Sequence, residues 1–191
     1  MNLFEDLPQN HFKTVLADPP WNFQTYSKKG RDRCPDARHY DVMNFGDLVA
    51  MSDSLRRVIA KDCALFMWVT DPMLQKSFNL LGLWGFEYKT VAFTWAKTGK
   101  KAKWPIGTGY WTRANPEMCL LATRGKPSRK SKAVRQLIVS PRREHSRKPD
   151  ETHDRIEALV DGPYLELFAR APRDGWTVWG NQTERFEANG D

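Results

Sequence analysis

The run Asp18-Pro19-Pro20-Trp21 directly follows an apolar segment, Val15-Leu16-Ala17. The apolar segment predicts a buried strand, and the prolines end it because neither has an N–H to donate to a neighbouring strand. Asp18 therefore stands at the carboxyl end of a strand, where open α/β sheets bind ligands. The Asp18 carboxylate and the Pro19 carbonyl can accept hydrogen bonds from an amino group, and Trp21 offers a ring for stacking. These groups predict a site for an amino-bearing planar base. A plain turn with a core tryptophan is the alternative.

Later predicted strands carry further polar side chains near their ends. Glu166 lies in the predicted strand 164–169, and an acid near the carboxyl end of such a strand commonly binds ligand hydroxyls. Arg170 follows that strand and can meet a carboxylate or a ribose. Asn181 and Gln182 follow the strand 176–179 and offer amides to nucleoside hydroxyls. A surface acid on an edge strand is the alternative for Glu166.

The chain is basic, with 30 Lys and Arg against 23 Asp and Glu and a net charge of +7 over 191 residues. This excess favours a polyanionic partner, nucleic acid first. Much of the positive charge lies in three predicted loops, 22–40, 97–113 and 124–148, for which a merely solvated surface is the alternative. The candidate nucleic-acid-binding residues are Lys28, Lys29, Arg31, Lys100, Lys101, Lys103, Arg113, Arg129 and Lys130.

The remaining composition narrows the class of protein. The three cysteines, Cys34, Cys63 and Cys119, show no C-x-x-C spacing, so we expect neither a disulfide framework nor a bound metal. The sequence has no signal-peptide pattern and no apolar run of membrane-spanning length. We therefore expect a cytoplasmic protein that has no membrane partner.

Predicted strands and helices alternate along the chain. This alternation is typical of a mostly parallel, doubly wound α/β sheet, and we expect a single domain over residues 1–191. The predicted strands are 14–17, 64–69, 87–95, 117–123, 137–139, 164–169 and 176–179, and the predicted helices are 44–61, 71–83 and one that begins at 149.

Five motifs in order resemble the MT-A70 family of adenine-N6 methyltransferases. They are DPPW at 18–21, an E-x-x-L pattern after Asn115, HSRKPDE at 145–151, ELFAR at 166–170 and WGNQ at 179–182. The resemblance covers about residues 12–183. It implies a Rossmann-like methyltransferase fold in which the catalytic DPPW motif precedes the cofactor-binding strand. It also implies S-adenosylmethionine as cofactor and direct methyl transfer to adenine N6 without a metal.

The resemblance assigns roles to individual residues. Asp18, Pro19, Pro20 and Trp21 would form the catalytic motif, with Trp21 receiving the base. The implied cofactor site consists of Asp18, Lys148, Glu166, Phe168, Arg170, Arg173, Asn181 and Gln182. Arg173 enters this set as a replacement, because eukaryotic relatives carry a histidine-asparagine pair after the arginine where this chain reads Ala171-Pro172-Arg173.

The expected substrate is DNA, because a short chain without an accessory domain suits a stand-alone bacterial or phage-type enzyme. RNA is the first alternative, since both polymers present the same adenine edge. A non-catalytic nucleic-acid-binding subunit of a methyltransferase complex is the second. A homodimer is expected by family analogy alone.

Overall fold

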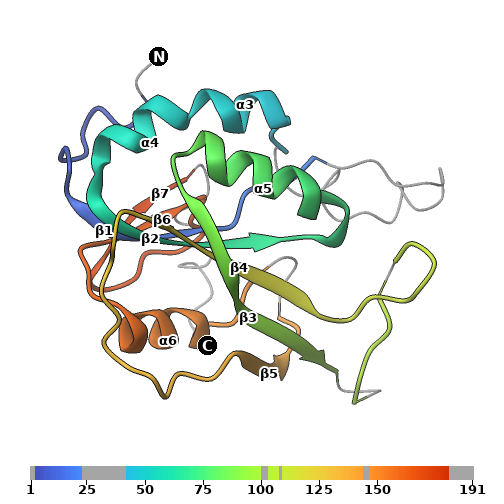
Figure 1. Ribbon diagram of the computed structural model, residues 1–191. Helices are drawn as coiled ribbons and strands as arrows, with labels where there is room; N and C mark the ends of the chain where they lie inside the picture. Colours follow the sequence, from blue (N-terminus) through green and yellow to red (C-terminus); the bar gives the residue numbers. More distant parts are fainter. Residues whose placement is uncertain (1–2, 23–41, 100–102, 108, 144–146, 181–191) are drawn as a thin grey trace.

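A seven-stranded sheet forms the centre of the computed structural model, which describes residues 3–22, 42–99, 103–107, 109–143 and 147–180 (Figure 1). The strands lie in the order β5-β3-β4-β2-β1-β6-β7. Their bounds are β1 Phe12–Ala17, β2 Ile59–Val69, β3 Glu87–Thr98, β4 Glu117–Arg124, β5 Leu137–Pro141, β6 Tyr164–Leu167 and β7 Trp176–Trp179. Neighbouring strands are parallel except at β4, which runs antiparallel to both β2 and β3.

Helices cover both faces of this sheet (Figure 1). One face carries α3 (Phe45–Ala50), α4 (Ser52–Val58) and α5 (Leu74–Leu83), and the other carries α6 (Glu151–Leu159). The helix predicted over 44–61 is thus two helices, and its last residues belong to β2. Its start was predicted correctly, because the backbone N–H of Asn44 donates to the Asp47 carboxylate at 3.0 Å.

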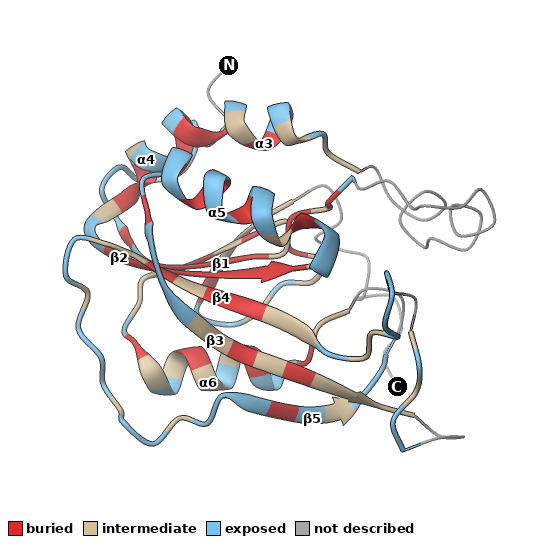
Figure 2. Ribbon diagram, turned by 45° about the vertical axis from the view of Figure 1, so that its right-hand side comes forward, coloured by how far each residue is buried: buried red, intermediate tan, exposed pale blue. Residues whose placement is uncertain are grey.

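The long apolar run of β2 follows from burial on both sides. Leu65 and Met67 pack into the core beneath α3–α5, whereas Phe66 and Trp68 pack into the core on the α6 side. Figure 2 shows the central strands buried along most of their length. Because successive side chains point to opposite faces, a strand between two cores is apolar at every position.

The reversed direction of β4 decides which residues share an edge of the sheet. Every other strand ends at one edge, which we name the carboxyl edge, and begins at the opposite, amino edge. In β4, Met118 pairs with Val69 near the end of β2, and Arg124 pairs with Cys63 near its beginning. Glu117 therefore lies at the carboxyl edge and Arg124 at the amino edge.

The predicted architecture is confirmed, since all seven predicted strands occur in a mostly parallel sheet with helices on both faces. Within the described part of the chain, no helix is long and apolar enough to cross a membrane. The same residues contain no group of three or more His, Cys, Asp or Glu that could hold a metal ion.

Candidate active site

Asp18 and Lys148 form an ion pair at the carboxyl edge. The Lys148 Nζ donates to both oxygens of the Asp18 carboxylate, at 2.9 Å each. Asp18 directly follows β1, and its backbone N–H donates to the carbonyl of Leu167 at the end of β6 at 3.4 Å. The two side chains are only 16% and 19% exposed. The predicted catalytic acid thus sits in a fixed orientation between two parallel strands.

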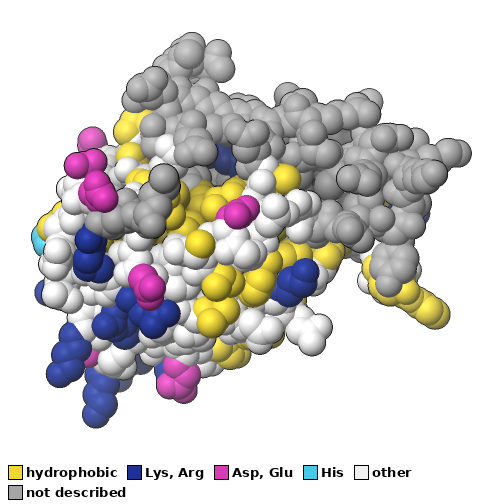
Figure 3. All heavy atoms as spheres, turned by 90° about the horizontal axis from the view of Figure 1, so that it is seen from above, with side chains coloured by type: hydrophobic (Ala, Val, Ile, Leu, Met, Phe, Trp, Pro, Cys, Tyr) yellow, Lys and Arg dark blue, Asp and Glu magenta, His cyan; other side chains and the backbone are white. Residues whose placement is uncertain are grey.

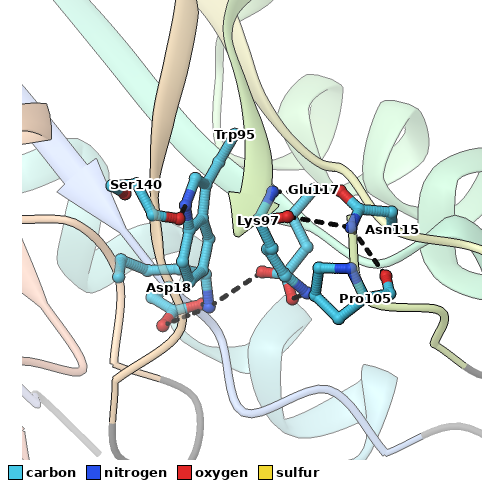
Figure 4. Close-up of polar contacts among 8 residues, drawn as sticks. Asp18, Trp95, Lys97, Pro105, Asn115, Glu117 and Ser140 are labelled. Carbon is cyan, nitrogen blue, oxygen red and sulfur yellow. Dashed lines mark hydrogen bonds and ion pairs between the residues drawn. The ribbon is translucent and has the colours of Figure 1, made fainter. Parts of the chain in front are cut away.

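A second carboxylate extends this pair into a chain of four charges (Figure 4). Glu117, the first residue of β4, lies 3.5 Å from the Lys148 Nζ and also pairs with Lys97 near the end of β3. Burial alone would raise the pKa of Glu117, but the charges of Lys148 and Lys97 outweigh it and hold the pKa below its ordinary value. Two acids and two bases therefore alternate in the order Asp18, Lys148, Glu117, Lys97.

Lys148 is the centre of this chain. Burial by itself would lower the pKa of its ammonium group, but the charges of Asp18 and Glu117 and the hydrogen bonds to Asp18 raise it above the ordinary value. The ammonium also lies 5.7 Å from the centre of the Trp68 ring. Lys148 therefore stays charged and keeps Asp18 in place.

A cavity of about 270 Å³ opens beside Asp18 on the α6 face of the sheet. It is lined by Leu16, Asp18, Trp68, Arg147, Lys148, Asp150, Thr152, His153, Glu166, Phe168, Arg170, Ala171, Pro172 and Arg173. The six predicted cofactor residues that the structure describes all line it.

The position of Glu166 follows from strand register. Glu166 pairs with Leu16, and in a parallel sheet such neighbours share a face, as does Asp18 two residues further on. From the same side α6 brings His153, whose Nε2 lies 2.8 Å from a Glu166 oxygen. Because a carboxylate only accepts, the imidazole donates this bond. Glu166 is thereby oriented toward the cavity's α6 wall.

The chain turns sharply where β6 ends. Phe168 has a φ of 64°, a left-handed conformation that is unusual for a bulky residue and marks local strain. Its ring meets Trp179 edge to face at 5.7 Å while lining the cavity. Gly180 makes this turn possible, because a Cβ there would come within 2.7 Å of the Ala169 carbonyl.

The model of the MT-A70 family matches residues 12–182 of this sequence. The chain belongs to the MT-A70 family. A type II methyltransferase, M.MunI of Mycoplasma sp, is 33% identical over 195 residues, which cover 93% of this chain and 80% of that protein. The human N(6)-adenosine-methyltransferase catalytic subunit METTL3 is 31% identical over 91% of this chain, and an Arabidopsis thaliana N(6)-adenosine-methyltransferase MT-A70-like protein is 30% identical over 90%. This chain spans only 28% and 24% of those two longer proteins.

Two expectations for the MT-A70 catalytic motif need correction. Trp21 was predicted to offer a stacking face, but it is 4% exposed and its indole N–H donates to the Trp68 carbonyl at 3.1 Å. Trp21 is thus a core residue, as the alternative held. The Pro19 carbonyl is not free either, since it accepts the Trp21 backbone N–H at 2.8 Å and keeps one lone pair for a ligand.

Arg173 is held by the protein rather than pointing freely into the cavity. Its guanidinium donates to Glu157 at 3.0 Å and to Asp154 at 2.7 Å, both on α6. Glu157 also accepts the indole N–H of Trp176 at 2.8 Å. Arg173 therefore ties the segment after β6 to α6. These two bonds use two of its five N–H donors, so the predicted contact with the cofactor would have to use the others.

The structure separates the predicted nucleic-acid residues. Lys103 and Arg113 lie between β3 and β4 at the carboxyl edge, on the side of Asp18. Lys130 lies at the amino edge, where its ammonium donates to the Glu157 carbonyl at the end of α6 and pairs with Asp161 at 3.3 Å. Arg129 precedes it and is exposed. Five predicted site residues, Lys28, Lys29, Arg31, Lys100 and Lys101, lie outside the described residues, as do Asn181 and Gln182.

The donor set of the cavity fits S-adenosylmethionine. The Trp68 indole N–H and the Thr152 hydroxyl are buried without a hydrogen-bond partner among the described residues, and both side chains belong to the cavity lining. Such orphaned groups are costly and are expected to meet a ligand. Together with Lys148 they suit a carboxylate, whereas Asp18 and Glu166 suit an ammonium group and hydroxyls.

Three residues of this site were not predicted from the sequence. Glu117 reaches Lys148 because β4 runs antiparallel, and Lys97 reaches Glu117, 20 positions away in the chain, because β3 pairs with β4. His153 reaches Glu166 only because α6 packs on that face. The available signal was the acid that begins the E-x-x-L pattern, which was noted without a role.

Proposed function

We propose that this MT-A70 protein is an S-adenosylmethionine-dependent methyltransferase that acts on N6 of adenine in DNA. The observation that carries the proposal is the Asp18–Lys148 pair in a cavity that Glu166, Phe168 and Arg170 also line. When bound, S-adenosylmethionine supplies a methyl group on a positively charged sulfur. Lys148, Trp68 and Thr152 would bind its carboxylate, Glu166 its ribose and Phe168 its adenine.

Asp18 is the residue that prepares the nucleophile. The N6 amine of adenine reacts poorly because its lone pair is delocalised into the ring. A carboxylate oxygen of Asp18 and the Pro19 carbonyl oxygen, through its remaining lone pair, would each accept a hydrogen bond from one N–H of this amine. These bonds strengthen as the nitrogen becomes tetrahedral and more acidic, so they stabilise the transition state more than the ground state.

Lys148 is a positioning residue for this step. Its ammonium binds both Asp18 oxygens, so it keeps the carboxylate in one orientation before substrate arrives. Glu117 binds the ammonium from the other side, so the Lys148 side chain is held between two carboxylates and its movement, and with it that of Asp18, is restricted. Such preorganisation lowers the barrier because no reorganisation is needed during the reaction.

The choice of DNA rests on similarity to the type II methyltransferase M.MunI, which is 33% identical over 93% of this chain. This chain spans 80% of the type II methyltransferase M.MunI, but less than a third of the two N(6)-adenosine-methyltransferases. RNA is the second candidate, because adenosine is the nucleoside of RNA and those relatives are 30% and 31% identical. The residues proposed here would contact only the adenine base, which DNA and RNA share, so the site itself does not favour either polymer.

The decisive experiment measures transfer of labelled methyl from S-adenosylmethionine to DNA and RNA pools, followed by digestion and separation of nucleosides. We expect label in N6-methyldeoxyadenosine and a loss of about 10²–10³-fold in Asp18→Asn. Asp53→Asn, which alters an exposed acid of α4, is the matched control and should keep full activity. Label in RNA alone would replace the DNA assignment by the second candidate. Equal activity of Asp18→Asn and wild type would overturn the catalytic role of Asp18.

A further inference from the structure

The connection between β3 and β4 exposes several large apolar side chains. We name its described residues, 103–107 and 109–114, the aromatic loop. Trp104 is 50% exposed, Tyr110 64% and Trp111 90%, with Ile106 between them at 75%. Contiguous exposed apolar groups on an ordered surface mark an interaction site.

The Asn115 side chain holds the base of the loop through hydrogen bonds to the backbone (Figure 4). The Asn115 amide donates to the carbonyls of Lys97 and Pro105, at 3.0 and 2.7 Å, and accepts the Lys97 backbone N–H at 3.0 Å. The Gly107 N–H donates to the Ala114 carbonyl at 2.7 Å. The loop thus keeps a defined form while its aromatic side chains face solvent.

Trp111 is also strained. Its φ of 67° is left-handed, a conformation that is rare for a bulky residue and costs free energy. The Trp111 ring meets the Tyr110 ring edge to face at 6.4 Å, but it is the most exposed of the large apolar side chains among the described residues, so burial offsets little of this cost. Strain that burial does not offset is common at ligand sites.

The anchor of the loop belongs to the catalytic charge chain. Lys97, which the Asn115 amide binds, pairs with Glu117, and Glu117 pairs with Lys148 beside Asp18. The loop therefore leaves the sheet at the carboxyl edge, beside the cavity. A polymer whose target adenine reached Asp18, at the mouth of the cavity, would extend past this loop.

We propose that Tyr110, Trp111 and Trp104 stack on unpaired bases that flank the target adenine, and that Lys103 and Arg113 contact the adjoining phosphates. The substrate class is thus a strand whose bases next to the target are unpaired. A cation next to an aromatic ring is the combination that single-strand sites use, and the Lys103 ammonium lies 5.5 Å from the Trp104 ring centre. The proposal rests on the proposed function for its target adenine.

The test measures affinity by fluorescence anisotropy, with one labelled mixed-sequence oligodeoxynucleotide used single-stranded and annealed to its complement. We expect wild type to bind the single strand more tightly and Trp111→Ala to lose about tenfold in single-strand affinity. Trp111→Phe should keep most of the affinity, whereas Trp111→Leu, which keeps bulk without a planar face, should not. Tyr88→Ala is the matched control, since Tyr88 is 39% exposed but lies at the amino edge, and it should bind like wild type.

Two outcomes would overturn the proposal. One is unchanged single-strand affinity in both Trp111→Ala and Trp111→Leu. The other is a change in self-association alone, measured by light scattering, which would assign the loop to contacts between copies of this chain. Thermal unfolding of each variant excludes loss of fold as the cause.

The result is separable from the methyltransferase assignment. Binding is measured without cofactor, so it does not depend on methyl transfer, and Asp53→Asn, at an exposed acid of α4, should bind the single strand like wild type. If wild type transfers no methyl yet binding depends on Trp111, the proposed function fails and the stacking surface stands. If methyl transfer proceeds and binding ignores Trp111, only the stacking surface fails.

Discussion

Both edges of the sheet carry many charged side chains, but one set at the carboxyl edge is largely buried beside the cavity, whereas the set at the amino edge is exposed. At the carboxyl edge, Asp18, Lys148, Glu117 and Lys97 bind one another beside a cavity, and both partners of each pair are largely buried. At the amino edge, Lys130 pairs with Asp161, and these side chains are 42% and 63% exposed. The first set defines a chemical site, whereas the second holds the end of α6 against the following turn.

The difference shows that positive charge along the sequence does not by itself indicate a functional site. What matters is the edge of the sheet at which the fold places each basic residue. The predicted loop 124–148 begins at the amino edge, where the Lys126 backbone N–H donates to Asp62 at 2.7 Å. It crosses the molecule as β5 and reaches the carboxyl edge, where the Arg142 N–H donates to the Thr98 carbonyl at 3.2 Å. One stretch of positive charge therefore serves two edges.

The largest contrast should come from removing one lysine at each edge. Lys148→Met leaves Asp18 buried without its partner and Glu117 paired with Lys97 alone, which should lower the free energy of unfolding by about 3–5 kcal/mol. Lys130→Met removes an exposed pair and should cost about 0–1 kcal/mol. Chemical denaturation of the two variants measures both values. Equal losses would show that the edges do not differ in this way.

Glycine substitutions should separate steric from conformational cost at the amino edge. Gly125 has a φ of 62°, and a Cβ there would meet the Lys61 carbonyl at 2.6 Å. We expect Gly125→Ala to destabilise by about 2–3 kcal/mol. Gly175 has a φ of 79°, and a Cβ there would face open space, so Gly175→Ala should cost only about 1 kcal/mol. Thermal melts give both numbers, and methyl transfer at permissive temperature should be unchanged in each. An activity loss specific to Gly125→Ala would place the amino edge in the reaction.

The pH dependence of stability should report the carboxyl edge. The folded-state pKa of Glu117 lies below its ordinary value of 4.5, so its contribution is present above that pH and is lost as pH falls through the folded pKa. Lys148 has the opposite sign, since its contribution is present below the ordinary value of 10.5 and is lost as pH rises through the raised pKa. When the free energy of unfolding is measured by chemical denaturation at several pH values, Glu117→Gln should therefore lose less stability on acidification than wild type. An equal loss in both proteins would show that Glu117 does not contribute to this pH dependence.

The smallest effect should appear in the salt dependence of nucleic-acid binding. Lys103→Ala and Arg113→Ala should each lower the slope of log K against log salt by about 1, because each removes one phosphate contact. Arg129→Ala and Lys130→Ala, at the opposite edge, should leave the slope unchanged. A reduced slope in the second pair would mean that nucleic acid reaches both edges.

Most of the sheet could be predicted because strands that are buried on both faces consist of consecutive apolar residues. The run Ala64–Val69 is apolar at every position since both of its faces are covered, and prolines end β1 where Asp18 must stand. The assignment of Lys148 to the cofactor site came only from the family resemblance, and its ion pair with Asp18 was not predicted. Nothing in the residues between them indicates that pairing.

The rest of the site depends on contacts that spacing does not encode. Glu117 meets Lys148 because β4 runs antiparallel, and the same reversal carries Lys130 away from the site. Trp21 was misplaced because an aromatic residue beside a polar motif has the same pattern whether it lines a ligand site or fills the core. Only the packing against Trp68 decides between them.

The distance along the chain between Asp18 and Lys148, 130 positions, has a consequence for how the protein is synthesised and folds. β1 emerges from the ribosome early, but its neighbour β6 and the counter-charge of Asp18 emerge only after most of the protein has been synthesised. Closing so long a loop is entropically costly until the intervening strands have paired. A prematurely terminated chain that lacks Lys148 and Glu166 therefore carries the DPPW motif without the residues that complete the cavity beside Asp18.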